Sequence, residues 1–400
     1  RRYGSPPVGA ALKADGRSGP DGVHERLELA ERMFELGQAE HDDDTTLWGW
    51  LWRFDAFMML GRLDEAEATL GRMWQLTERL RRPLALWHYL RSKAAVETVR
   101  GRFDDAVTTM DDCRRLVQGR THDSVEGVTI FVLLILEGLI GRGDLVKQEF
   151  LDMFDQKSPR FVMPIYAVYW AQRGDLERAR RLCGTIDNEM FPRPALLPTL
   201  ASRIELAAMF GEADIATELA DRLRPYADLF ATGGAGTVLN FGSVHTYLGI
   251  AAASGGRLDE AVREFRLGIT ANDAAGAPPY SALARFELAQ VLARRRRPGD
   301  ADEAAALCAS VTASAVRLGM KPLQARADEL AATLRGDAPS GLTRREAEVA
   351  SHVAQGLTNK QVAALMHISE RTAETHVQHI LTKLGLANRT QIAAWAAQRN

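Results

Sequence analysis

The chain has 400 residues, 46% of them hydrophobic and 26% charged, so it is long enough for two or more domains with buried cores. Its most apolar stretch, VTIFVLLILEGLIG, falls short of the roughly 20 residues that a membrane-spanning helix needs. Cys113, Cys183 and Cys308 have no C-x-x-C spacing, which argues against disulfides or a zinc site and predicts buried thiols in a reducing cytosol. We therefore expect a cytoplasmic protein with no membrane partner.

The net charge of −2 is unevenly distributed. From Gly341 to the end, seven basic residues face four acidic ones, a net charge of +3, so the rest of the chain carries −5. A small basic region attached to a larger acidic one indicates different partners for each, and a polyanion for the basic part.

The first 23 residues contain arginines and a Gly/Pro cluster but no apolar run of the signal-peptide kind. We expect residues 1–23 to form a disordered lead-in. The first residue is Arg rather than Met, which is consistent with a piece of a longer chain.

A short signature then recurs along the chain. It is spelled GRLDEA, GRFDDA, GRGDLV, GDLERA, GEADIA, GRLDEA and GDADEA, and its successive copies end 40, 40, 33, 37, 45 and 43 residues apart. This period is typical of helical-hairpin arrays. Each copy follows an apolar run, has Gly where a helix would end, and places acidic residues where the next helix would begin, as its dipole favours.

Each repeat therefore reads as two helices joined by a tight turn, with a small residue, usually Ala, that lets them approach closely. The array resembles degenerate, lengthened tetratricopeptide repeats over residues 24–335, and strand signals are nearly absent, so we expect an all-α chain. We expect three tryptophans to pack in the core between repeats rather than to form a ligand cage: Trp48, Trp50 and Trp52. Repeat arrays form concave binding surfaces, so a site for a peptide or an inducer on this array stays an alternative.

Gly, Pro and Ser interrupt the helical pattern at residues 336–341, which we interpret as a linker. In the domain that follows, residues 342–400, the first helix should run from Thr343, with Glu346 in capping-box spacing, to Gln355. The second should begin after Thr358 and end at Met366, the third should run from Ser369 or Glu370 to Leu384, and the fourth should follow Asn388. Two short helices joined by a tight turn form a helix-turn-helix, whose second helix can enter a major groove.

A helical wheel of the third helix separates three faces. The apolar face consists of Ala373, Val377, Ile380, Leu381 and Leu384. The opposite, polar face consists of Arg371, Glu374, Thr375, Gln378 and Thr382. Between the two faces lies a flank formed by Thr372, His376, His379 and Lys383. The polar face suits base edges and the flank suits phosphates, although a solvated helix face would look the same. His376 and His379 are too few for a metal site without further ligands, so we assign no metal.

The segment LTRREAEVASHVAQGLTNKQVAALMHISERTAETHVQHILTKLGLANRTQIAAWA resembles, from end to end, the LuxR-type (LuxR/FixJ, GerE-like) DNA-binding domain. The matching motifs are L-T-x-R-E, G-x-[ST]-N-K-x-[IV]-A, I-S-x-x-T, H-x-x-x-I-x-x-K-L and the final R-T-Q. The resemblance implies that the third helix reads bases, that the second helix and its turn anchor phosphates, and that the fourth helix pairs two subunits. Glu374 is a departure, because the family usually has Lys or another polar residue there.

Carried over by position, the resemblance implies three sets of residues. The base contacts would be Glu374, Thr375 and Gln378; the backbone contacts Thr358, Asn359, Lys360, Arg371, Thr372, His376, His379, Lys383 and Arg389; and the dimer interface Ile392, Trp395 and Ala396. The last set lies on one face of the fourth helix, and a helix packed within its own domain would show the same pattern.

Large LuxR-type regulators carry a signalling ATPase, a helical-repeat sensor and this domain in that order, and the chain resembles the last two parts. It contains no G-x-x-x-x-G-K-[ST] and no G-x-S-x-G motif, so we expect neither an enzyme nor a cofactor. The sequence thus predicts a DNA-binding transcription regulator with double-stranded DNA, RNA polymerase, a second copy of the chain and an inducer or protein as partners. The alternative is an interaction scaffold whose terminal domain contacts polymerase or another protein instead of DNA.

Overall fold

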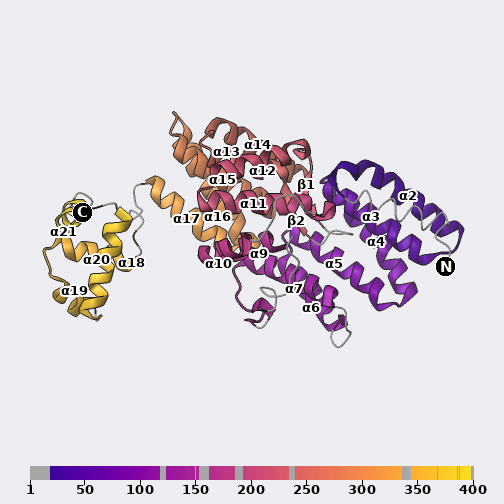
Figure 1. The fold of residues 1–400 in the computed structure, drawn as a ribbon, viewed down its shortest axis with the longest axis horizontal. Helices are drawn as coiled ribbons and strands as arrows, with labels where there is room; N and C mark the ends of the chain where they lie inside the picture. Colours follow the sequence, from indigo (N-terminus) through magenta and orange to yellow (C-terminus); the bar gives the residue numbers. More distant parts are fainter. Residues whose placement is uncertain are drawn as a thin grey trace. The chain divides into compact units, whose positions relative to one another are not determined.

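The computed structural model describes residues 19–117, 123–148, 150–152, 162–184, 192–233, 239–335, 342, 344–366, 368–384, 386 and 388–397. Contacts divide the chain into two compact units, residues 1–327 and 328–400 (Figure 1). The expected linker, residues 336–341, lies outside the described residues, as do residues 1–18 of the expected lead-in. In the rest of the expected lead-in, Pro20–Gly22 form a short 3₁₀ helix, and the Gly19 carbonyl accepts a hydrogen bond of 3.0 Å from Arg26 Nη1.

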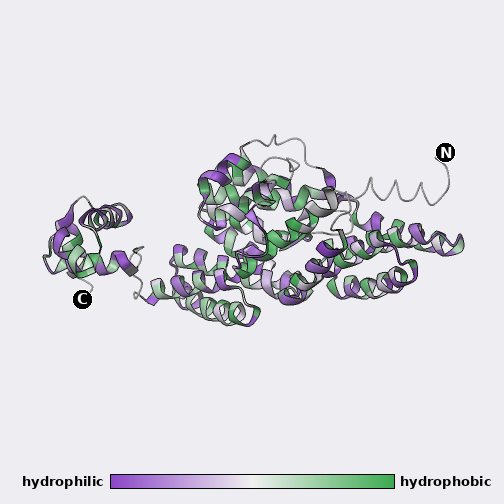
Figure 2. Ribbon diagram, turned by 90° about the horizontal axis from the view of Figure 1, so that it is seen from below, coloured by the Kyte–Doolittle hydropathy of each residue, from purple (hydrophilic) through white to green (hydrophobic). Residues whose placement is uncertain are grey.

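The first unit is a succession of helical hairpins. Its helices are α2 (Val23–Ala39), α3 (Asp43–Met59), α4 (Leu63–Leu80), α5 (Pro83–Val99), α6 (Phe103–Val117), α7 (Asp123–Ile140), α9 (Met163–Gln172), α10 (Leu176–Cys183), α11 (Leu196–Phe210), α12 (Ala213–Leu223), α13 (Val244–Ser254), α14 (Leu258–Ala275), α15 (Pro278–Arg295), α16 (Asp300–Leu318) and the first part of α17 (Lys321–Arg335). Apolar and polar residues alternate around them (Figure 2). The described helices include none with the length and hydropathy of a membrane span. The prediction of an all-α fold is confirmed, apart from one small sheet.

The recurring signature marks the turns of these hairpins. The glycine of each copy has a positive φ, between 70° and 87°, a left-handed conformation that glycine adopts without steric cost. These glycines are Gly61, Gly101, Gly141, Gly174, Gly211, Gly256 and Gly299. In six copies the closing alanine is fully buried, which allows the two helices of the hairpin to approach closely; these are Ala66, Ala106, Ala179, Ala216, Ala261 and Ala304.

The third copy, GRGDLV, does not restart a helix as the pattern predicts. Residues 143–146 form bends, and the buried Glu137 carboxylate accepts hydrogen bonds of 3.1 Å from the backbone N–H groups of Leu145 and Val146. A second glycine, Gly143, weakens helix formation here by roughly 1 kcal/mol relative to alanine. The segment is therefore held by a side chain of α7 instead of by helical hydrogen bonds.

A two-stranded antiparallel sheet, which the sequence did not predict, interrupts the array between α12 and α13. It consists of β1 (Phe230–Gly233) and β2 (Leu239–Ser243). β1 packs on α3 and α11, and β2 packs on α5, α14 and α15, so the hairpin joins the first helices of the unit to the later ones (Figure 1).

The aromatic and sulfur-containing side chains assigned to the core are mostly buried. Trp50 and Trp52 are 4% and 3% exposed, whereas Trp48 is 38% exposed and stacks on Trp52. Cys113 and Cys308 are buried free thiols and Cys183 is partly buried. Burial raises the pKa of the Cys113 thiol to about 12, which keeps it protonated and unreactive at neutral pH.

Candidate nucleic-acid interface

The second unit contains a compact domain of four helices around one apolar core. These helices are α18 (Arg344–Ala354), α19 (Asn359–Met366), α20 (Glu370–Leu384) and α21 (Arg389–Ala397). Val349, Val362, Ile380 and Ile392 are fully buried and contribute one side chain from each helix. Because every helix supplies core residues, the orientation of α20 about its own axis is fixed by packing.

The beginnings of α19 and α20 are defined by local hydrogen bonds. The Thr358 backbone N–H donates to Gln361 Oε1 at 2.8 Å, and the Gln361 N–H donates to Thr358 Oγ1 at 3.3 Å, which is a reciprocal capping box. Ser369 Oγ accepts from the Thr372 N–H at 3.1 Å and caps α20. These signals produce the predicted helix-turn-helix. Thr343, the cap expected for the first helix, lies outside the described residues.

The faces of α20 follow the helical wheel. Ala373 and Ile380 are fully buried, and Val377 is 9% exposed. Arg371, Glu374, Thr375, Gln378 and Thr382 are all exposed on the other side. The hydroxyls of Thr375 and Thr382 bond to carbonyls of their own helix, at 2.9 and 3.0 Å. No ion pair joins Arg371 to Glu374 in the part of the chain that the structure describes.

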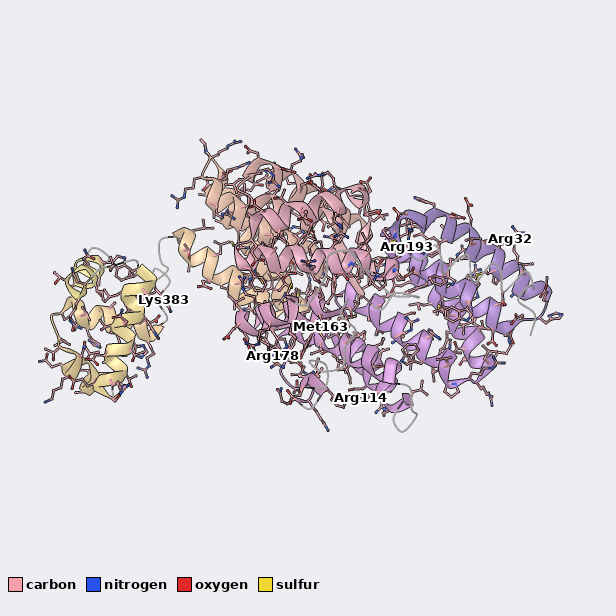
Figure 3. The ribbon with its side chains drawn as sticks, viewed as in Figure 1. Arg32, Arg114, Met163, Arg178, Arg193 and Lys383 are labelled. Atoms are coloured by element: carbon pink, nitrogen blue, oxygen red, sulfur yellow. The ribbon has the colours of Figure 1, made fainter. Side chains whose placement is uncertain are left out.

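Three residues assigned to the DNA backbone are engaged within the domain itself. Arg389 Nη1 donates to Asn359 Oδ1 at 2.6 Å, and its other terminal nitrogen donates to the Leu357 carbonyl. Lys383 Nζ, labelled in Figure 3, donates to Glu346 Oε2 at 2.7 Å. These contacts place α21 and α20 against the rest of the domain, and they give Asn359, Lys383 and Arg389 a positioning role.

The remaining backbone candidates line the outside of the domain. Thr358, Lys360, Arg371, Thr372 and His379 are exposed, and His376 is half-buried. His379 Nδ1 lies 3.9 Å from Glu346 Oε1, which adds a second basic group beside that carboxylate. Lys360 lies on α19 with its side chain in solvent, as a phosphate contact requires.

Two of the three residues assigned to a subunit interface are buried within the domain itself. Ile392 is fully buried in its core, and Ala396 is 7% exposed. Trp395 is half-buried and packs on the edge of that core. A domain of this size has few apolar residues to spare, so the apolar face of its last helix is used internally.

Glu346 is the residue whose role the sequence did not reveal. Its capping-box spacing from Thr343 suggests an exposed cap, but its side chain is only 4% exposed and faces α20. The partner, Lys383, lies 37 residues further along the chain, and no local pattern connects the two.

This geometry defines a helix-turn-helix domain of the kind that inserts its second helix into DNA. Residues 340–396 match the family model of bacterial regulatory proteins, luxR family. This C-terminal segment is therefore a LuxR-family helix-turn-helix domain, a class of domain with which bacterial transcription regulators bind DNA.

Individual relatives match over the same segment. The chain is 49% identical over 59 residues to the uncharacterized transcriptional regulatory protein YhcZ of Bacillus subtilis, which is 15% of this chain and 28% of that protein. It is 42% identical over 74 residues to the DNA-binding transcriptional activator DevR/DosR of Mycobacterium tuberculosis, 17% of this chain and 34% of that protein. The chain thus spans about a third or less of the length of these two relatives.

A solved structure is similar to the chain only at a distance. It is a Rap protein complexed with competence and sporulation factor, and the likeness covers 95% of this chain and 100% of that one, with 14% identity and a TM-score of 0.34.

Proposed function

We propose that the chain is a sequence-specific transcription regulator whose α20 reads the major groove. The observation that carries this proposal is the exposed stripe of Glu374, Thr375 and Gln378 on a helix whose opposite face is packed into the core. Glu, Thr and Gln side chains form hydrogen bonds by which base edges are distinguished.

The charge distribution supports the same proposal. The basic C-terminal region, with a net charge of +3, is attached to a chain whose remainder carries −5. The small excess of positive charge suits a phosphate backbone, and the acidic remainder would be repelled by it. Lys360 is the clearest phosphate contact, since its side chain is exposed on α19.

Recognition by a dimer is part of the proposal. A single helix-turn-helix contacts few base pairs, so useful specificity normally requires two half-sites and a symmetric dimer. With Ile392 and Ala396 buried in the domain core, contacts through α21 would come from its exposed Thr390 and Gln391 and from Trp395. A footprint with two related half-sites, shortened by Trp395→Ala, is the expected result; a single undivided half-site would contradict it.

We further infer that the repeat unit is the sensing or interaction arm and that the protein acts in the cytoplasm, with RNA polymerase as the downstream partner. Helical-repeat arrays present extended concave surfaces, which suit ligands and protein partners. The acidic character of this part of the chain is consistent with a role away from DNA.

The decisive experiment is selection of DNA from a random pool by the full chain, with the variant Gln378→Ala as the control for groove reading. We expect one enriched motif, and a relaxed preference at one position in the variant. If no motif is enriched, the terminal domain does not read DNA and the chain acts as an interaction scaffold.

A further inference from the structure

A cavity of about 130 Å³ lies within the first unit, and all of its lining residues belong to that unit. Its lining comes from α7, α9, α11, α13, α15 and α17, with Phe241 of β2. These are the first helices of successive hairpins, and in repeat arrays equivalent helices form one continuous surface. The cavity is therefore a product of the repeat architecture.

Aromatic rings make up much of this lining. They are Phe131, Tyr166, Tyr169, Phe241, Tyr247 and Tyr280. Several are held in place by their hydroxyls: Tyr169 donates to Glu137 Oε1 at 2.7 Å, Tyr166 to the Leu151 carbonyl at 3.0 Å, and Tyr247 to the Phe241 carbonyl at 3.0 Å. Fixed aromatic rings around a small space attract cations through the negative potential of their faces.

The hydroxyl of Tyr280 stands apart from the others. The side chain is 5% exposed and lines the cavity, yet within the described residues its oxygen has no hydrogen-bond partner. A buried polar group without a partner costs roughly 1 to 3 kcal/mol, and a bound polar ligand would remove that cost.

Two carboxylates face the same space. Glu205 accepts a hydrogen bond of 3.0 Å from Gln172 Nε2 and has no cationic partner within the described residues. Glu287 is paired with Arg326 at 3.2 Å. The lining thus contains two carboxylates and one guanidinium, so the charge beside the aromatic rings is negative when both carboxylates are ionised.

Both carboxylates are half-buried. Desolvation raises the pKa of Glu205 and of Glu287, and the charge of Glu287 raises that of Glu205 further, while the Gln172 hydrogen bond and the Arg326 charge act in the opposite direction. A charged carboxylate in a poorly solvated place is stabilised by a cation at close range. A cation beside Glu205 would therefore stabilise the ionised form of this carboxylate.

We propose that this cavity binds a small organic cation, an ammonium group attached to an apolar body about the size of one aromatic ring. The ammonium would lie between Glu205 and the Tyr280 hydroxyl, and the apolar body among the rings. The size follows from the volume, because a cavity of about 150 Å³ is known to hold benzene. The proposal names the ligand class of the sensing arm and rests on that part of the proposed function.

The test is isothermal titration of the full chain, without DNA, with benzylamine, benzyl alcohol and benzoate. These probes share a ring and differ in charge. We expect benzylamine to bind at least tenfold more tightly than benzyl alcohol, and benzoate to bind least. Equal affinity for the amine and the alcohol, or no binding of any probe at millimolar concentration, would overturn the proposal.

Two variants and a control locate the site. Glu205→Gln keeps the shape of the side chain and removes its charge, so the preference for the amine should disappear while the alcohol binds as before. Tyr280→Phe should weaken benzylamine binding severalfold. Glu218→Gln changes an exposed carboxylate on α12 and should have no effect. An amine preference that survives Glu205→Gln would overturn the assignment.

A failure of this inference can be told apart from a failure of the proposed function. The titration contains no DNA, so it reports on the cavity alone, whereas the DNA selection reports on the terminal domain alone. A separate measurement, the affinity of the full chain for its selected motif with and without benzylamine, then tests whether the two sites are coupled. An unchanged affinity would overturn the sensing role while leaving both binding sites in place.

Discussion

The Lys383 ammonium donates a hydrogen bond of 2.7 Å to Glu346 Oε2 and thereby joins α20 to α18. The carboxylate is almost fully buried, with 4% of its side chain exposed, whereas 38% of the lysine side chain reaches solvent. A buried carboxylate requires such a partner, because its own desolvation is unfavourable. The pair therefore fixes the position of α20 against α18 within the domain.

Removal of the lysine should therefore destabilise the domain. In Lys383→Met the Glu346 carboxylate loses the lysine that donates to it, and we expect a cost of about 3 kcal/mol, the lower end of the range for broken buried pairs because the lysine is partly solvated and His379 lies 3.9 Å from the same carboxylate. Amide hydrogen exchange of peptides from α18 and α20 should become roughly 100-fold faster.

A matched control separates stability from DNA binding. Lys360→Met removes the same charge from an exposed site on α19, so exchange should be unchanged while DNA affinity falls. Glu346→Gln combined with Lys383→Met should recover part of the lost protection, since no buried charge remains. Equal exchange in Lys383→Met and Lys360→Met would show that the pair contributes nothing to stability.

The second prediction distinguishes phosphate contacts from base contacts. Lys360→Ala should weaken binding to all sequences alike and reduce the slope of log affinity against log salt by about one unit. Gln378→Ala should relax the preference at one base pair, at a cost of roughly 1 to 3 kcal/mol, with an unchanged salt slope. Titrations at several salt concentrations against matched and mismatched sites measure both effects. Identical profiles for the two variants would remove the distinction.

Local signals in the sequence were sufficient for the helix-turn-helix. Thr358, Ser369 and Asn388 cap the helices that follow them, because each side chain accepts from the backbone N–H three residues on, a relationship fixed by sequence spacing. The turns of the repeats were equally local, since only glycine adopts their backbone conformation at no cost. Features of this kind need no knowledge of the tertiary fold.

Contacts between distant residues were not predictable in this way. Glu346 shares a capping-box spacing with Thr343, yet its partner comes from α20. The buried faces of α21 could belong to a core or to a second subunit, and only the structure shows that Ile392 lies in the core. The cavity depends on residues from six helices, none of which carries a recognisable motif.

The third prediction concerns Asp300 at the first position of α16. Its carboxylate accepts hydrogen bonds of 2.7 and 3.0 Å from Arg295 and one of 2.8 Å from the Arg297 backbone N–H. These hydrogen bonds, chiefly that from the Arg295 side chain, lower its pKa from 3.8 to about 2. Because the folded pKa lies below the unfolded one, Asp300 stabilises the fold above that unfolded value, and the contribution is lost as the pH falls toward the folded pKa.

Thermal unfolding of the full chain and of Asp300→Asn should show this dependence. The midpoint of the variant should lie below that of the wild type at pH 7, and the difference should shrink between about pH 4 and pH 2. Asp302→Asn removes an exposed carboxylate from the first turn of the same helix and should shift the midpoint far less. A wild-type advantage that persists undiminished at pH 2 would contradict the role assigned to the ion pair.

The last prediction concerns Glu374, at the centre of the exposed stripe of α20, where the LuxR-type pattern usually has Lys or another polar residue. A carboxylate there can accept a hydrogen bond from the N4 amino group of cytosine, or it can merely repel phosphates. Donors are found on the groove floor and the phosphate walls offer only acceptors, so a side chain directed inward should discriminate between bases. No ion pair with Arg371 is present among the described residues, so the carboxylate keeps its accepting capacity for a base.

We therefore expect a cytosine preference at one position of each half-site. Glu374→Lys should change that preference to guanine, which lysine contacts through O6 and N7, by roughly 1 to 3 kcal/mol. Affinity for all sequences should also rise, because each subunit gains positive charge near the phosphates. Binding measured for all four bases at that position, with both proteins, separates the two effects. A uniform gain in affinity for the four bases would mean that Glu374 reads no base and only limits nonspecific binding.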